Sequence, residues 1–301
     1  MTDGYNSSTR GASAPKATAI LIAHNQAAEL RRALQALERS QDRDRFEILV
    51  IDSGSQDDAG NLSEEFPGIT LLRLPHHFGA TKAMNIATRT AKTVFLFFLS
   101  PDVEVAPDTI RLLTERLEAE SEATAVCPLL VDATGAPVAR IQPLPTRETM
   151  AQVCAGGEPP HIAPDLTQES IAVGYPGRDA LLVRKQFIIG MNYFDARFGE
   201  YWADADLALK IRHARKKILL YPAIRARWHA PARRAPDDPV YSAALYSADR
   251  VLGAALLLRK HEGFFAGLTF RLSAIVSALL HFDFRLFAAL LSGEKVGSQA
   301  S

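Results

Sequence analysis

The sequence has few cysteines, no excess of charge of either sign and no long uninterrupted apolar run. Cys127 and Cys154 are its two cysteines, and neither belongs to a CxxC pair or a His/Cys cluster. This argues against a disulfide scaffold and against a zinc module, and it favours a reducing, cytoplasmic compartment. Lys and Arg number 34 and Asp and Glu also number 34, so the basic excess of a general nucleic-acid binder is missing. We therefore expect no nucleic-acid partner.

Targeting signals and confident membrane spans are not visible either. Residues 1–16 are polar, contain several Gly and Ser and lack an apolar core, so we expect a disordered tail there. The nearest approach to a span is 263–282, which is interrupted by Arg271 and carries His281 near its end. With 48% apolar residues, the chain has ample material for one large folded domain or two small ones.

The first 130 residues alternate between β-rich apolar runs and amphipathic stretches. This alternation is typical of βαβ units and predicts an α/β fold with a doubly wound, mostly parallel sheet. Ligands of such sheets bind beyond the carboxyl ends of the strands. Residues 132–178 are rich in Pro and Gly, and we expect a long excursion over the sheet. The predicted strands of this half are 17–24, 46–51, 69–74, 93–99 and 123–131.

Regular patterns return after residue 180. We expect a helix over about 204–215 and mostly helical structure over 240–292. Two short strands are predicted between them, over 218–221 and 226–229, with Pro222 ending the first.

Two acidic residues directly follow predicted strands. Asp52 could accept hydrogen bonds from a base or a ribose, although an Asx turn would explain it without a ligand. Asp102 could bind a divalent cation that bridges two phosphates, or it could simply form the turn between Pro101 and Pro107. One carboxylate is a weak metal site, so further ligands would have to come from phosphates, water or a second side chain.

Residues 201–207 carry two acids at the start of the predicted helix. Side chains at i and i+2 diverge on a helix, so Asp204 and Asp206 should serve different roles. Asp204, next to Trp202, could be partly desolvated, which would raise its pKa toward use as a general base. For Asp206 we expect N-capping of the helix.

A local basic stripe follows. Residues 207–234 contain nine Lys and Arg and no Asp or Glu. The stripe could meet phosphates or an anionic membrane surface, or it could be a solvated helix face. His229 lies within it, and on its own it carries little weight, because a lone histidine is more often structural than a ligand.

Taken together, these motifs resemble the family 2 inverting glycosyltransferases of the GT-A fold, and within them the rhamnosyltransferase-like enzymes of bacterial polysaccharide synthesis. The resemblance extends from about Ala17 to His229. Its last part is the most specific, because it follows the family's Gly-x-Phe-Asp-Glu, Tyr-x-Glu-Asp-x-Asp-Leu and final His in order and spacing. The stretches that carry it are AILIAHNQAAELRRALQAL, EILVIDSGSQDD, HHFGATKAMNIATRTAKTVFLFFLSPDVEVAP, IGMNYFDARFGEYWADADLALKIR and ILLYPAIRARWH.

The resemblance implies transfer of a sugar, with inversion, from a nucleotide-diphosphate donor to a saccharide or lipid-linked saccharide acceptor. It implies Asp204 as the catalytic base and a Mg²⁺ or Mn²⁺ ion held by Asp102 and His229. Such an ion would neutralise charge on the departing nucleoside diphosphate. It also implies a GT-A catalytic domain over 17–239 and a C-terminal helical extension over 240–301. The residues implied in nucleotide-sugar binding are Asn25, Asp52, Gly79, Asn85, Asp102 and Trp202.

Some positions depart from the family pattern. Ala203 replaces the Glu before the base, Ser100 replaces the first acid of Asp-x-Asp, and His77 replaces an Asn. Ala203 and Ser100 keep a second hypothesis open, a catalytically degenerate relative that binds nucleotide sugars or acts as a scaffold. A nucleotidyltransferase or a Rossmann dehydrogenase is disfavoured, because no glycine-rich loop follows the first strand.

The C-terminal extension leaves two arrangements open. Residues 243–292 are apolar around much of the helix circumference, with Arg and Lys spaced among them. The helices could pack on the catalytic domain or on a second subunit in a homo-oligomer. Alternatively, they could lie on the inner face of the plasma membrane, with the basic residues toward anionic headgroups. The expected location is thus the cytoplasm, either free or peripheral at that membrane.

Overall fold

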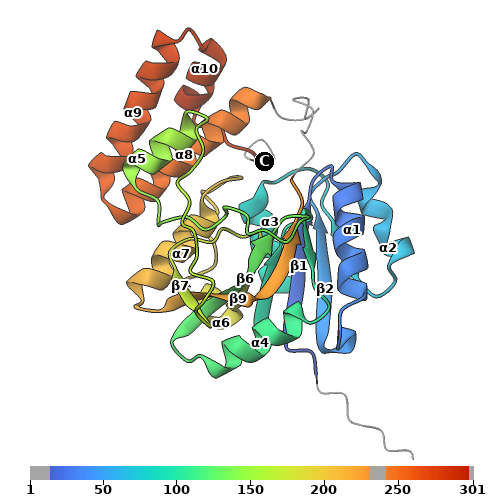
Figure 1. Ribbon diagram of the computed structural model, residues 1–301. Coiled ribbons are helices and arrows are strands. Elements are labelled where there is room, and N and C mark those ends of the chain that lie inside the picture. The colour runs from blue at the N-terminus through green and yellow to red at the C-terminus, as the bar shows by residue number, and fades with distance from the viewer. Residues whose placement is uncertain (1–13, 231–241, 298–301) are drawn as a thin grey trace, which may run out of the picture.

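The computed structural model describes residues 14–230 and 242–297. Residues 1–13 of the expected tail, and the boundary expected between residues 239 and 240, lie outside this part of the chain. A twisted sheet forms the centre, with helices on both faces, and a group of C-terminal helices packs to one side (Figure 1). The predicted α/β class with a C-terminal helical extension is confirmed.

The first half of the sheet is parallel and the second half is mixed. β3, β2, β1 and β4 pair in parallel, as the alternating sequence pattern predicts. β8 then runs antiparallel to β4 and β6, β9 pairs in parallel with β6, and β5 and β7 are antiparallel to β9. The strands, in sheet order, are β3 (Thr70–Arg73), β2 (Phe46–Asp52), β1 (Ala17–Ala23), β4 (Phe95–Leu99), β8 (Ala180–Arg184), β6 (Ala123–Val131), β9 (Lys217–Trp228) and β5 (Val103–Val105), with β7 (Ile171–Val173) also on β9.

Apolar faces of the helices cover the sheet on both sides. α1 and α4 bury their leucines on one face, while α3, α7 and α8 contribute to the core on the other. The 132–178 excursion crosses the sheet as expected, but it contains α5 and β7, which the weak sequence pattern did not predict. The helices are α1 (Ala27–Glu38), α2 (Leu62–Glu65), α3 (Ala80–Thr90), α4 (Thr109–Ala119), α5 (Arg147–Cys154), α6 (Lys185–Gly190), α7 (Ala203–His213), α8 (Ala243–His261), α9 (Phe264–Leu280) and α10 (Phe284–Ser292).

The two short strands predicted around Pro222 are one continuous strand, β9. Pro128 of β6 pairs with Tyr221, and the next residue, Leu129, pairs with Arg225. Three residues of β9 therefore bulge out of register. Pro222 lies in this bulge, where its missing N–H interrupts no regular ladder pair, so it bends the strand without ending it.

The C-terminal extension packs on the rest of the protein through α8. Val251, Leu252 and Leu258 of this helix are buried in the same core as α3 and α7. α9 and α10 pack mainly on α8 and on each other, farther from the sheet (Figure 1). Within the described residues, no helix has the length and apolar character needed to cross a bilayer.

Candidate functional site

Asp52 is the last residue of β2, and its side chain is fully buried. Its Oδ1 accepts a hydrogen bond from the backbone N–H of Ser55 at 2.9 Å, which closes the turn that follows β2. Its Oδ2 lies 3.5 Å from Nε of Arg73. A Cβ added at Gly60 would lie 3.0 Å from the same oxygen, so a glycine leaves this side of the carboxylate open. The turn and the arginine together fix the carboxylate at the strand end.

Asn25 follows β1 and joins the loops beyond the two strands. Its φ is +52°, in the left-handed region that Asn tolerates better than most residues. Its backbone N–H donates to Oγ of Ser55 at 3.0 Å, and its Oδ1 accepts from the N–H of Gln56 at 2.8 Å. Asn25 therefore holds the loop that follows Asp52 against the end of β1.

Gly79 lies where three distant segments approach one another. Its φ is +79°, and a Cβ there would lie 3.1 Å from the carbonyl carbon of Gly199 and 3.2 Å from the carbonyl oxygen of Val296. Only a residue without a side chain permits this approach. The carbonyl of Gly199 also accepts hydrogen bonds from the N–H and the hydroxyl of Thr81, in the first turn of α3.

Glu200 is the principal residue that the sequence analysis missed. Its Oε2 accepts from the N–H of Ala80 at 2.8 Å and lies 3.4 Å from Nε2 of His77, while its Oε1 lies 3.2 Å from Arg178. Burial raises the pKa of Glu200, but the hydrogen bond from His77 and the charge of Arg178 outweigh burial and lower the pKa to about 2. The carboxylate therefore stays ionised at the N-terminus of α3, where the helix dipole favours a negative charge.

Histidine rings fill the space between Glu200 and the strand ends. The rings of His24 and His77 are stacked with their centroids 4.1 Å apart. The ring of His77 is also hydrogen-bonded to the hydroxyl of Ser53 at 2.9 Å, in the loop after Asp52. The departure from the family's Asn at residue 77 thus introduces an aromatic ring that connects this loop to Glu200.

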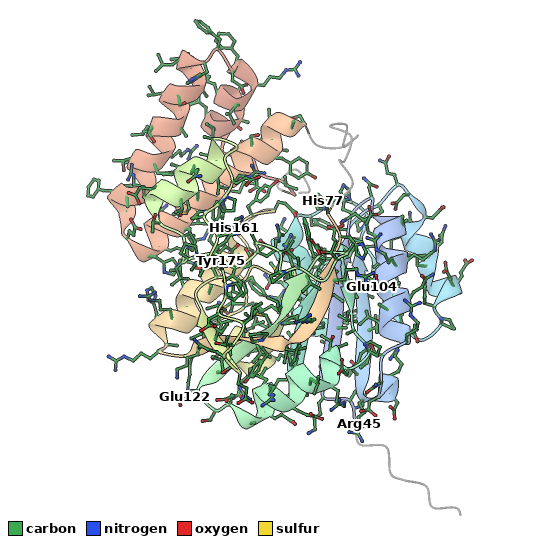
Figure 2. The ribbon with its side chains drawn as sticks, in the orientation of Figure 1. Arg45, His77, Glu104, Glu122, His161 and Tyr175 are labelled. Atoms are coloured by element: carbon green, nitrogen blue, oxygen red, sulfur yellow. The ribbon has the colours of Figure 1, made fainter. Side chains whose placement is uncertain are left out.

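Asp204 lies in the first turn of α7. The hydroxyl of Tyr175 donates to its Oδ2 at 2.9 Å, and the N–H of Ala205 donates to its Oδ1 at 3.0 Å. Burial and the neighbouring Asp204 charge raise the pKa of Tyr175 well above its usual value, so the phenol remains a hydrogen-bond donor. Tyr175 lies at the end of the 132–178 excursion (Figure 2), which therefore contributes a contact to the predicted base.

Arg178 contributes positive charge between two carboxylates. Burial lowers the pKa of Arg178, but the charges of Glu200 and Asp204 outweigh it and raise the pKa above its usual value. The family's Glu at position 203 is a buried alanine here. The groups that contact or polarise Asp204 in this chain are thus Tyr175 and Arg178, which come from a different part of the sequence.

Asp206 does not cap α7, and that expectation is wrong. Its side chain is 1% exposed and lies 2.7 Å from Nζ of Lys260, 3.1 Å from Nζ of Lys210 and 2.8 Å from Nε2 of His261. Two of these three partners belong to α8. The ion pairs hold α7 against the C-terminal extension. Asp206 therefore stabilises a contact between two distant helices and does not cap its own helix.

Trp202 and Asn85 are held within the fold. The indole N–H of Trp202 donates to the carbonyl of Arg250 at 2.8 Å, so the ring lies between α7 and α8. The amide of Asn85 both donates to the carbonyl of Phe194, at 2.8 Å, and accepts from its N–H, at 3.0 Å. These contacts give both side chains a positioning role behind the site, and their direct contact with a donor remains a prediction.

The main chains of Asp102 and His229, the two residues of the predicted metal site, lie next to each other. The N–H of His229 donates to the carbonyl of Asp102 at 2.8 Å, beside the pairing of β5 with β9. The imidazole Nε2 of His229 lies 3.0 Å from Oε2 of Glu104, a second acid that the sequence analysis missed (Figure 2). No group of three or more metal-ligating side chains occurs in residues 14–230 and 242–297. The donor set fits a divalent cation when phosphate oxygens and water complete the coordination.

Comparisons with known proteins give a partial family match and structural neighbours. Residues 18–157 match the family model described as Glycosyl transferase family 2. This match covers 140 of the 301 residues, a little less than half of the chain. No curated protein matches the sequence significantly.

Solved structures show the same fold at low sequence identity. GalNAc-T7 with UDP, GalNAc and Mn²⁺ aligns with a TM-score of 0.63 and 16% identity, over 82% of this chain and 48% of that one. TarS 1–349 of S. aureus aligns with a TM-score of 0.53 and 13% identity, over 81% and 65%. Mannosyltransferase PcManGT from Pyrobaculum calidifontis, in complex with GDP-Man and Mn²⁺, aligns with a TM-score of 0.53 and 16% identity, over 93% and 86%. The chain thus spans about half of GalNAc-T7 and somewhat less than two thirds of TarS 1–349, and the predicted GT-A fold is confirmed.

Proposed function

We propose that this protein transfers a sugar from a nucleotide-diphosphate donor to a hydroxyl of a saccharide or lipid-linked saccharide, with inversion, in bacterial polysaccharide synthesis. Asp204 takes the proton of the acceptor hydroxyl while that oxygen bonds to the anomeric carbon. The bond from this carbon to the diphosphate breaks on the opposite face, and the nucleoside diphosphate leaves. The observation that carries the proposal is the hydrogen bond from Tyr175 to Asp204 at the start of α7, in a chain whose residues 18–157 match the family 2 glycosyltransferase model.

The contacts of Asp204 favour catalysis over the degenerate-scaffold alternative. A base needs one oxygen free to accept a proton and an environment that fixes its orientation. Tyr175 and the N–H of Ala205 orient the carboxylate, and each of its oxygens retains accepting capacity. Arg178, which pairs with Glu200 and interacts electrostatically with Asp204, places a positive charge near the base, opposite in sign to the family Glu that is missing. A scaffold would have no use for such an arrangement around an acid in the first turn of a helix.

The donor is proposed to bind beyond the ends of β1, β2 and β4. Asp52 would hold the nucleoside, and the loops joined by Asn25 and Gly79 would shape the diphosphate region. Asp102 and His229 would hold Mg²⁺ or Mn²⁺ together with diphosphate oxygens, and the bound ion would supply charge neutralisation to the leaving group. Glu104 would hold the imidazole of His229 through its hydrogen bond. GalNAc-T7 and PcManGT, crystallised with Mn²⁺ and a nucleotide or nucleotide sugar, support this reading.

A thermal-shift panel tests donor binding directly. We expect one of UDP, dTDP, GDP and CMP to stabilise the protein, and the shift to depend on Mg²⁺ or Mn²⁺. At 100 times its dissociation constant a ligand adds about 2.7 kcal/mol, which corresponds to roughly 4 °C for a chain of this size. Flat curves with all four nucleotides and both metals would contradict the donor site and favour a scaffold.

The exposed face of α9 and α10 supports a second proposal, contact with an anionic membrane. Phe265 is 76% exposed and Phe282 77%, and the exposed apolar side chains of α9 recur every three or four residues along one face. We call this set the apolar face. It consists of Phe264, Phe265, Leu268, Leu272, Val276, Leu279, Leu280, Phe282, Phe284 and Leu291.

Sedimentation with phosphatidylglycerol-containing vesicles tests the membrane contact. We expect the protein to pellet at low salt and the double variant Phe265→Glu/Leu272→Glu to remain in the supernatant, because carboxylates on the apolar face oppose insertion. Val94→Glu changes an equally exposed apolar residue outside this face and serves as the matched control. Wild-type protein that stays in the supernatant, and elutes as a dimer whose association the double variant abolishes, would assign the face to a second copy instead.

A further inference from the structure

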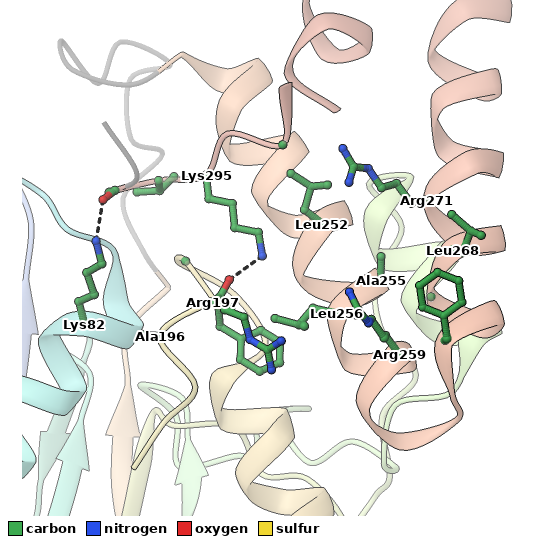
Figure 3. Close-up of a pocket in the computed structure, with 17 residues that line it drawn as sticks. Lys82, Ala196, Arg197, Leu252, Ala255, Leu256, Arg259, Leu268, Arg271 and Lys295 are labelled. Atoms are coloured by element: carbon green, nitrogen blue, oxygen red, sulfur yellow. Dashed lines mark hydrogen bonds between the residues drawn. The ribbon is translucent and has the colours of Figure 1, made fainter. Parts of the chain in front are cut away.

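A cavity of about 570 Å³ lies between α8, α9, the loop before α7 and the segment after α10. Its volume is in the range of small-molecule sites. Leu252 and Leu256 of α8 line one side, and Phe264 and Leu268 of α9 line another (Figure 3). The cavity wall also carries five cations and no carboxylate, and these are Lys82, Arg197, Arg259, Arg271 and Lys295.

Most of these cations have only neutral partners. Arg197 is paired with Asp195, at 2.7 Å. By contrast, Lys82 donates to the carbonyl of Gly297, Arg271 donates to the carbonyl of Leu290, and Arg259 lies 5.3 Å from the ring centre of Phe264. In the part of the chain that the structure describes, none of these last three has an ion pair with a carboxylate.

Lys295 lies on the same wall, and the charges of Asp249 and Asp195 offset part of its positive charge. Its ammonium donates to the carbonyl of Arg197 at 2.7 Å (Figure 3), and burial lowers its pKa below the usual value. Cations gathered on one partly buried wall raise the local positive potential, and an anion bound among them would relieve it. A phosphate suits Arg259 and Arg271 in particular, because guanidinium groups match its oxygens in a two-pronged geometry.

The apolar part of the cavity continues onto the apolar face. Phe264 is 53% exposed and Leu268 is 38% exposed, and both line the cavity while also belonging to that face. A ligand with a charged head among the cations could therefore extend an apolar chain over α9 without exposing it to water. A wholly polar anion would make no use of the apolar contacts with the leucines, and an uncharged chain would give Lys82, Arg259 and Arg271 no anionic partner.

We propose that this cavity binds a lipid phosphate, with the phosphate against Arg259 and the start of the chain against Leu256 and Leu268. The inference deepens the membrane contact proposed above, since a membrane would present such a lipid at the apolar face. The cavity also borders the candidate site, because Gly199 lines its wall and the next residue, Glu200, contacts His77.

Farnesyl phosphate, a soluble lipid phosphate, tests the site by calorimetry without a membrane. We expect wild-type protein to bind it. Farnesol, which lacks the phosphate, and inorganic phosphate, which lacks the apolar chain, should each bind at least tenfold more weakly. Arg259→Gln should weaken binding about tenfold through the loss of a charge-assisted hydrogen bond. Arg285→Gln, on α10 outside the cavity, should leave binding unchanged.

A second variant tests whether the ligand occupies the cavity without changing the charge of the protein. Leu256→Trp fills part of the cavity without removing a cation, and it should also weaken farnesyl phosphate binding. Equal binding of farnesyl phosphate and farnesol, or of farnesyl phosphate and inorganic phosphate, would overturn the proposal. So would equal effects of Arg259→Gln and Arg285→Gln. The nucleotide thermal shift, measured on the same variants, should be unaffected, so that failure of the donor site and failure of the lipid site are told apart.

Discussion

Asp204→Asn should lower the rate of sugar transfer by about a thousandfold and leave nucleotide affinity within about twofold of wild type. The amide cannot accept the proton of the acceptor hydroxyl, but it has almost the shape of the carboxylate. Its oxygen can still accept from the N–H of Ala205, and the hydroxyl of Tyr175 can rotate to accept from the new NH₂ group. Transfer assays with the donor identified by the thermal-shift panel, together with nucleotide titrations, measure both quantities.

Tyr175→Phe tests how much the hydrogen bond from Tyr175 contributes to catalysis by Asp204. The variant keeps the ring and removes the donor to Asp204, so we expect a loss of about tenfold in kcat. Because Tyr175 acts through the orientation of the base, the loss should appear in kcat and leave the KM of the donor within about twofold of wild type. Full transfer activity in purified Asp204→Asn would remove this residue from the mechanism, whatever Tyr175→Phe does.

The site residues that could be predicted from the sequence are those whose position follows from neighbouring residues in the chain. Buried parallel strands appear as continuous apolar runs, so the ends of β1, β2 and β4 could be found within a residue or two. Asp52 ends β2, and Asn25 and Asp102 lie two and three residues beyond the ends of β1 and β4, which places all three at one edge of the sheet. For these three residues, sequence neighbours decide the position.

The residues that were missed depend on contacts between distant segments. Glu104 meets His229 across 125 residues, and Tyr175 meets Asp204 across 29 residues from an excursion with no periodic pattern. Glu200 lies inside the most specific motif, three residues before the position where the family's Glu is missing. Its contacts come from Ala80 and Arg178, which no local pattern connects to it.

The antiparallel pairing in the second half of the sheet was not predicted, again because it depends on contacts between distant segments. The alternating strand and helix pattern predicts parallel pairing, but it holds only up to about residue 131. Beyond that point the chain crosses the sheet over 132–178 and returns in β8, which inserts antiparallel between β4 and β6. Where such a strand inserts depends on which edge of the sheet is still unpaired. The residue pattern of a single strand does not indicate this edge.

Asp206→Asn should lower the free energy of unfolding by about 3–5 kcal/mol, the range for removing one partner from a buried ion pair. The variant leaves Lys210, Lys260 and His261 facing a neutral amide at the contact between α7 and α8. Urea unfolding at neutral pH measures the difference. Glu115→Gln is the matched control, because Arg111 and Glu115 form an i,i+4 pair of the same 3.1 Å length on the exposed side of α4. Its expected cost is below about 0.5 kcal/mol.

The pH dependence gives this prediction a second, independent check. Burial raises the pKa of Asp206, but hydrogen bonds from His261 and Lys260 outweigh it and lower the pKa below the usual 3.8. A lowered folded-state pKa stabilises the fold above the unfolded-state pKa, and this contribution is lost as the pH falls through the folded value. The difference between wild type and Asp206→Asn should therefore shrink as the pH falls below about 4. A cost similar to that of Glu115→Gln, with no change on acidification, would mean that α7 is held to α8 by apolar packing alone. The candidate base would then owe its position to Trp202 and the leucines of α8.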